Sequence, residues 1–209
     1  MKIRPMPPAE MLIIDDFDQL IYNEIKPAPD LWDWIKSEII SPDGSIHNDE
    51  HSHLMDANIG VLWAQRSFRK QGRGVVGQAE QLAFRAGGWQ KARQELQMRD
   101  WFGGIPDYLI TFAADFCYEC SDAEFCALVE HELYHIRQKS DAFGAPKFNQ
   151  EGMPVLELRG HDVEEFVGVV RRYGASEAVQ EMIDAAKGDP EVSRINISRA
   201  CGTCLLKLA

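Results

Sequence analysis

The sequence contains two histidines separated by three residues, with a glutamate directly after the first: His131-Glu132-Leu133-Tyr134-His135. On a helix, residues four apart lie on the same face, so the imidazoles of His131 and His135 can bind one metal ion. Glu132 is then placed to act on a water held by the metal, not on the metal itself. Zinc lowers the pKa of such a water to about 7, and a carboxylate can take its proton. The motif therefore predicts a zinc site at which Glu132 promotes hydrolysis.

The residues around the motif predict the helix that positions it. Ser121 and Glu124 form S-x-x-E, the pattern of a capping box, so we expect a helix over residues 121–138. Apolar residues recur in this stretch at steps of three and four, as they do on the buried face of a helix. These residues are Phe125, Leu128, Val129, Leu133 and Ile136. A structural helix with two satisfied core histidines is the alternative, but the motif in this context favours a metal site.

A catalytic zinc needs a third protein ligand, and His161 is the only histidine after the motif. We predict a second helix over residues 161–173, which begins at His161 and also carries Glu164 and Glu165. His161 is favoured because imidazole suits zinc, and Glu164 or Glu165 is the alternative ligand. Whichever of these side chains does not bind zinc can hydrogen-bond a ligand and orient it.

Two further clusters contain residues that bind metals in other proteins. His47, His51 and His53 lie in an acidic stretch that reads as a loop entering a strand, which favours a rim or substrate-contact role over a ligand role. The cysteines include two C-x-x-C pairs, at residues 117–120 and 201–204, and one more, Cys126. If the C-terminus folds back, Cys117, Cys120, Cys201 and Cys204 can form a structural zinc site; reduced core thiols are the favoured interpretation.

Periodicity predicts the elements around the motif helix. Helices are expected over residues 31–40, 78–84, 89–101 and 176–187, strands over 59–63 and 107–116, and a small hairpin around 155–158. Residues 66–78 are expected to form a loop, and their glycines do not match a dinucleotide-binding motif. Because an extended peptide can pair with a strand beside the active helix, the strand over 107–116 or its neighbour is the candidate substrate edge.

Composition limits the class of protein. With 209 residues, of which 45% are hydrophobic and 26% charged, we expect a single domain over residues 1–209, with an irregular lead-in over 1–10 and a C-terminal segment over 190–209. The net charge of −11 argues against nucleic acid as the main partner. No apolar run is long enough for a membrane span or a signal peptide. We therefore expect a cytoplasmic protein whose five cysteines are reduced or metal-bound.

Several stretches together resemble a known family. The motif stretch over residues 122–136, preceded by Pro-Asp-Tyr-Leu-Ile-Thr at 106–111 and followed by Gly-His-Asp-Val-Glu-Glu-Phe at 160–166, is similar to the family of putative phage metallopeptidases. The resemblance extends upstream through residues 75–80 and 59–63 to His51. It implies an HExxH zinc peptidase fold broadly similar to the SprT-like and ImmA-like intracellular peptidases, encoded by phages or prophages. It also implies that His131 and His135 bind zinc and that Glu132 is catalytic.

The expected fold is α+β and zincin-like, with a small sheet packed against the HExxH helix. The expected function is zinc-dependent hydrolysis of peptide bonds in an intracellular protein substrate. A non-catalytic zinc-containing module that binds or regulates proteins is the alternative. The sequence offers Tyr134, Arg159 and Tyr173 as candidates for stabilising the oxyanion, without choosing among them, and it gives no indication of the oligomeric state.

Overall fold

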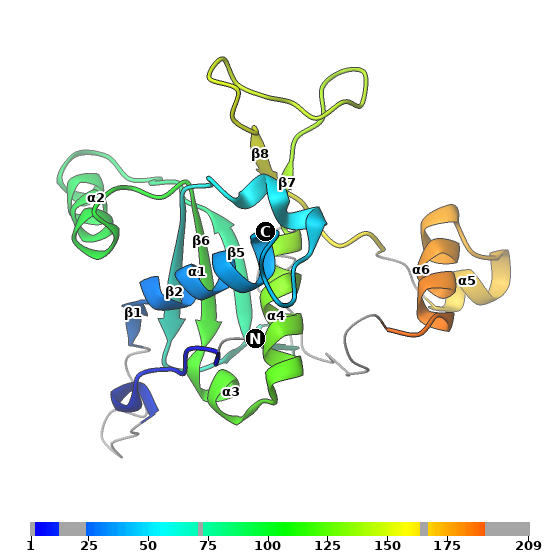
Figure 1. Ribbon diagram of the computed structural model, residues 1–209, viewed down its shortest axis with the longest axis horizontal. Helices are drawn as coiled ribbons and strands as arrows, with labels where there is room; N and C mark the ends of the chain where they lie inside the picture. Colours follow the sequence, from blue (N-terminus) through cyan, green and yellow to red (C-terminus); the bar gives the residue numbers. More distant parts are fainter. Residues whose placement is uncertain (1–2, 13–23, 71–72, 164–166, 191–209) are drawn as a thin grey trace.

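The computed structural model describes residues 3–12, 24–70, 73–163 and 167–190 (Figure 1). Its centre is a four-stranded mixed sheet in the order β1-β2-β6-β5. Strands β2 and β6 run parallel in the middle, and β1 and β5 pair antiparallel at the two sides. The four strands are Ile25–Pro27 (β1), Ile59–Ala64 (β2), Gly77–Gln81 (β5) and Tyr108–Ala113 (β6). The predicted α+β class and the predicted strands at 59–63 and within 107–116 are confirmed.

Side chains on the two sides of β6 enter two separate apolar clusters, as the period of two along a strand requires. Phe112 packs against Phe125 of the motif helix, with ring centroids 6.4 Å apart, and the ring of Trp34 lies 5.8 Å from that of Phe125. Leu109, on the opposite side of the strand, joins a smaller cluster with Leu62 and Met98. The sheet is thus anchored to the motif helix by aromatic contacts.

Three helical segments flank these clusters. Helix α1 (Pro29–Ile35) carries Trp34 and continues as one π-helical turn, η3 (Lys36–Ile40), so the helix predicted over 31–40 is confirmed. Helix α2 (Gly88–Phe102) carries Met98 and confirms the helix predicted over 89–101. The short helix α3 (Ala114–Glu119) lies between β6 and the motif helix, where the sequence predicted a strand that continued to residue 116.

The segment before α2 differs from its prediction. Residues 78–84 were expected to be helical, but residues 77–81 form strand β5, and the expected loop over 66–78 contains the hairpin of β3 (Phe68–Lys70) and β4 (Arg73–Val75). Gln78 and Glu80 make the stretch polar, which obscured the strand. Pairing with β6 buries Ala79 between them, and such tertiary contacts outweigh weak local preference.

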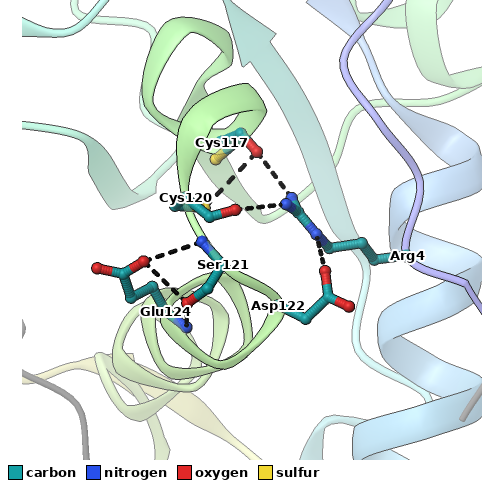
Figure 2. A network of polar contacts seen from close by, with 6 residues as sticks. All are labelled: Arg4, Cys117, Cys120, Ser121, Asp122 and Glu124. Atoms are coloured by element: carbon teal, nitrogen blue, oxygen red, sulfur yellow. Dashed lines mark hydrogen bonds and ion pairs between the residues drawn. The ribbon is translucent and has the colours of Figure 1, made fainter.

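The motif helix is α4 (Asp122–Tyr134), and it starts where the sequence predicted. The hydroxyl of Ser121 accepts a hydrogen bond from the backbone N–H of Glu124 at 3.3 Å, and the Glu124 carboxylate accepts one from the backbone N–H of Ser121 at 2.9 Å (Figure 2). The helix ends at Tyr134 instead of residue 138, because residues 136–138 leave it to pair as a strand. Ile136 is fully buried there, which stabilises the earlier end.

Arg4, in the lead-in, holds the corner at which α3 ends and α4 begins (Figure 2). Its guanidinium donates to the backbone carbonyls of Cys117 at 2.7 Å and Cys120 at 2.8 Å, and it pairs with Asp122 at 2.7 Å. The guanidinium carbon also lies 4.7 Å from the centre of the Phe125 ring. Carbonyls at a helix end have no partner within the helix, so Arg4 satisfies groups that would otherwise be buried without one.

We expect Arg4→Ala to lower the free energy of unfolding by about 3 kcal/mol, because a hydrogen bond from a charged donor contributes about 1.5–3 kcal/mol and two buried carbonyls lose their partner. Urea denaturation measures the change. Lys91→Ala is the control, since Lys91 forms a half-exposed pair with Glu95 on α2, and such pairs contribute about 1 kcal/mol or less. Equal losses for the two variants would show that Arg4 does not secure the corner.

A hairpin follows the motif helix directly. Strand β7 (Ile136–Gln138) pairs antiparallel with β8 (Leu156–Leu158), which confirms the hairpin predicted around 155–158. Residues 139–155 between them form two successive loops, seen at the top of Figure 1. Each begins with a side chain that accepts two backbone N–H groups, Asp141 in the first and Asn149 in the second. The hairpin thus returns the chain to the end of α4.

The C-terminal described part is a helical pair, α5 (Val167–Tyr173) and α6 (Glu177–Lys187), drawn to one side of the sheet in Figure 1. Helix α6 confirms the helix predicted over 176–187. The helix predicted over 161–173 is wrong at its start, because residues 161–163 are not helical and α5 begins at Val167. Backbone and side-chain bonds from Arg159 hold the chain before residue 163 against α4 instead.

Candidate metal centre

Three histidines meet at the C-terminal end of α4. His131 lies in the last turn of the helix, and His135 is its C-terminal capping residue, so the predicted spacing of one turn is retained. The third is His161, whose Nε2 lies 3.2 Å from Nε2 of His131. Ring centroids in the group are 5.0–5.2 Å apart, and one nitrogen from each ring lies within 4.8 Å of the others. This arrangement can hold a metal ion.

In the described part of the chain, no other group of three or more histidine, cysteine, aspartate or glutamate side chains has ligand atoms this close together. Three imidazoles are a donor set that suits zinc, with the fourth tetrahedral position left for water or substrate. Glu164 and Glu165, the alternative third ligands, lie outside the described residues. His161 joins the two motif histidines without being part of a helix.

The chemical state of the histidines also fits metal binding. Burial, together with the neighbouring rings of His135 and His161, lowers the pKa of His131 to about 4, so its imidazole is neutral and able to bind a metal at pH 7. His135 donates from Nδ1 to the backbone carbonyl of Arg159 at 2.9 Å. That bond fixes the tautomer, because it leaves the lone pair of His135 on Nε2.

Glu132 is fully buried and lies against the edge strand β5. A Cβ atom added to Gly77 would lie 2.6 Å from Oε1 of Glu132 and 2.9 Å from a methyl group of Leu128. Glu132 therefore lies on a different side of α4 from Tyr134, next to the face that carries His131 and His135. In the sequence, Gly77 was only one glycine of an expected loop. A glycine inside a strand often marks a close approach of another side chain, and that signal could have identified it.

We expect Gly77→Ala to displace the Glu132 carboxylate, because the added methyl group has no room. Overpacking of this kind costs about 1–3 kcal/mol of unfolding free energy. Thermal or urea denaturation measures that loss, and any hydrolytic activity should fall with it. Gly74→Ala in β4 is the matched control, since a Cβ there meets nothing within 4 Å. A stable Gly77→Ala protein, indistinguishable from Gly74→Ala, would contradict the close fit.

The cluster of His47, His51 and His53 does not join the three histidines at the end of α4. Helix η4 (Asp49–Leu54) carries His51 and His53, and His47 lies just before it, beside Asp49. His51 is fully buried, with Nε2 3.8 Å from the Glu130 carboxylate, and His53 donates to the backbone carbonyl of Ile136 at 2.9 Å. His51 therefore contacts α4 and His53 contacts β7, outside the group of three converging histidines, and the rim or substrate-contact role stays a prediction.

A cavity of about 850 Å³ opens beside the three histidines. Tyr134 and Arg159 line it, whereas Tyr173 lies in α5 with 76% of its surface exposed. The Tyr134 hydroxyl donates to the Glu50 carboxylate at 2.5 Å and accepts from Asn48 at 3.1 Å. Burial and the bond to Glu50 raise the pKa of Tyr134 to about 12, so the hydroxyl keeps its proton at pH 7 and donates it in the hydrogen bond to Glu50.

The cysteines of the first C-x-x-C pair lie at the corner between α3 and α4. Cys117, Cys120 and Cys126 are buried and free. Hydrogen bonding to Cys120, with burial, raises the pKa of Cys117 well above its ordinary value, whereas the same hydrogen bond lowers the pKa of Cys120. Burial raises the pKa of Cys126 to about 11. Cys201 and Cys204 lie outside the described residues, so the four-cysteine zinc site stays a prediction.

The chain was compared with known protein families, curated proteins and solved structures. No helix in the described residues has both the length and the apolar character needed to cross a membrane. No match was found among curated proteins or among solved structures. A family model described as "putative phage metallopeptidase" matches residues 32–187, most of the chain, including α4 and His161. The chain belongs to the putative phage metallopeptidase family.

Proposed function

We propose that this protein is a zinc-dependent metallopeptidase that hydrolyses peptide bonds in an intracellular protein, and that it is encoded by a phage or prophage. The proposal rests on one observation: His131, His135 and His161 meet close to Glu132, a buried glutamate on the helix α4 that also carries His131. Family membership supports the reaction class. We propose further that residues 1–209 act as a single domain.

The proposed roles follow from where each side chain lies. The three histidines would hold zinc, which supplies Lewis-acid activation of the scissile carbonyl and of water. Glu132, one residue from His131, accepts the proton of the attacking water and passes it to the leaving amine. The carboxylate is buried and occupies the space that a side chain at position 77 would fill. The same carboxylate serves both proton transfers.

The substrate would lie along β5, which ends the sheet on the side of α4. The sequence offered the strand over 107–116 or its neighbour as the substrate edge; β6 is interior, so its neighbour β5 is the candidate. Gly77 brings this strand against Glu132. A peptide that pairs with β5 would therefore pass close to the proposed catalytic glutamate.

A proteome-wide digest tests the proposal. A cell extract is incubated with the zinc-loaded wild-type protein and, in parallel, with Glu132→Gln, and new peptide termini are identified by mass spectrometry. Termini that form only with the wild type would identify the substrate class. If zinc binds stoichiometrically but the two digests are the same, the protein is a zinc-containing binding or regulatory module without turnover.

A further inference from the structure

The side chain of Arg159 joins the turn that carries His161 to the end of α4. We propose that Arg159 is a positioning residue for the third histidine, which it holds in the place needed to complete the metal centre. This inference rests on the proposed zinc site. His161 is exposed and lies outside any helix, so local secondary structure does not fix its position.

The backbone of Arg159 already ties this segment to the helix. Its N–H donates to the carbonyl of His135 at 2.9 Å, and its carbonyl accepts from Nδ1 of His135 at 2.9 Å. The first of these bonds continues the pairing of β7 with β8, in which Ile136 lies opposite Leu158. They bring the chain to within two residues of His161, and Gly160 is the residue between Arg159 and the histidine.

The side chain of Arg159 makes contacts at both ends of the turn that carries His161. Its Nε donates to the carbonyl of Tyr134, the last residue of α4, at 2.9 Å. Its Nη1 pairs with Asp162, the residue directly after His161, at 2.8 Å, and Nη2 lies 3.4 Å from the same carboxylate. The guanidinium therefore connects the last residue of α4, Tyr134, to Asp162, the residue directly after His161.

The position of the guanidinium explains why an arginine is suited to this role. A cation near the last carbonyls of a helix is favoured by the helix dipole and satisfies a carbonyl that has no partner within the helix. Only 28% of the Arg159 side chain is exposed, so its bond to Tyr134 is partly shielded from water. A planar guanidinium can serve two acceptors in different directions, whereas a lysine ammonium lacks that fixed fork.

The hairpin contains a second arginine that serves as a matched control. Arg137 in β7 pairs with Glu157 in β8, with Nε and Nη2 at 2.9 and 2.7 Å from one carboxylate oxygen. It is more exposed, at 54%, and it bonds Glu157 within the hairpin instead of the two ends of the turn that carries His161. Loss of Arg137 should therefore perturb the same hairpin without releasing the third histidine.

The test is the zinc affinity of the purified full chain, measured by competition with a chromogenic chelator. We expect Arg159→Ala to bind zinc about 10–100-fold more weakly than the wild type, as loss of a group that orients a ligand does. Arg159→Lys should fall between the two, Asp162→Asn should show a smaller loss, and Arg137→Ala should match the wild type. The absorption spectrum of the cobalt-substituted protein should change in Arg159→Ala, because the geometry around the metal is altered.

The outcomes separate this inference from the proposed function. A wild-type protein that binds no zinc would refute the metal site itself. A wild type that binds zinc tightly, with Arg159→Ala and Asp162→Asn no weaker than Arg137→Ala, would overturn only the role of Arg159. If Arg159→Ala does not fold, as judged by circular dichroism, Arg159→Lys and Asp162→Asn decide the question by the same affinity measurement.

Discussion

Glu132→Gln should reduce peptide hydrolysis by about 10²–10⁴-fold, the usual contribution of a general acid–base residue. Glutamine has nearly the same size and shape as glutamate, so the site beside Gly77 stays filled. Its amide cannot accept the proton of the attacking water. Zinc content should be unchanged, because Glu132 is not among the three side chains that converge as ligands. The measurements are steady-state cleavage of a substrate found in the digest and elemental analysis of the purified protein.

Glu130→Gln is the matched control for this experiment. Glu130 lies on the same helix but accepts a hydrogen bond from Asn48, on the side of η4. A glutamine at that position can still accept this bond, so cleavage should be close to that of the wild type. Equal activity of Glu132→Gln and the wild type would remove Glu132 from the mechanism. Equal losses in the two glutamine variants would indicate a general effect on the helix.

His161→Ala should lose zinc on mild dialysis and lose hydrolysis with it. Two imidazoles on one helix leave the metal with two protein ligands, fewer than the three that catalytic zinc sites use. Zinc content after dialysis measures the effect. His47→Ala is the control, because His47 pairs with Asp49 away from the three converging histidines and should retain stoichiometric zinc.

The same measurement decides between His161 and the carboxylates that follow it. Glu164→Ala and Glu165→Ala should keep zinc, with affinity lowered by about 10–100-fold if either residue orients a ligand. Stoichiometric zinc in His161→Ala, combined with its loss in one of the glutamate variants, would make the site two histidines and a carboxylate. The ligand assignment proposed above would then be wrong.

Predictions from the sequence were most accurate where short-range chemistry decides the structure. The start of α4 followed from the capping box of Ser121 and Glu124, whose two hydrogen bonds involve neighbouring residues only. Helices α2 and α6, predicted from their periodicity, end at glycines, Gly103 and Gly188, as helices commonly do. Strand β2, buried along its whole length, was evident from its continuous apolar run.

Predictions failed where a distant partner decides the structure. Strand β5 has a polar sequence, and only its pairing with β6 makes it a strand. The last part of the predicted motif helix became β7 because β8 pairs with it. His161 was expected to open a helix, but the bonds of Arg159 to Tyr134 and Asp162 hold that turn in an irregular conformation. Of these partners, only Asp162 is close in sequence to the segment that it holds.

The sequence by itself determined the helix α4 and the relative positions of His131, Glu132 and His135, because a helix with a defined start fixes which side chains share a face. Only the tertiary structure decided that His161 joins them, since its approach depends on the β7–β8 pairing and on Arg159. It also decided that Gly77 leaves room for the Glu132 carboxylate. Local spacing encodes the first half of such a site, and the register of a distant hairpin completes it.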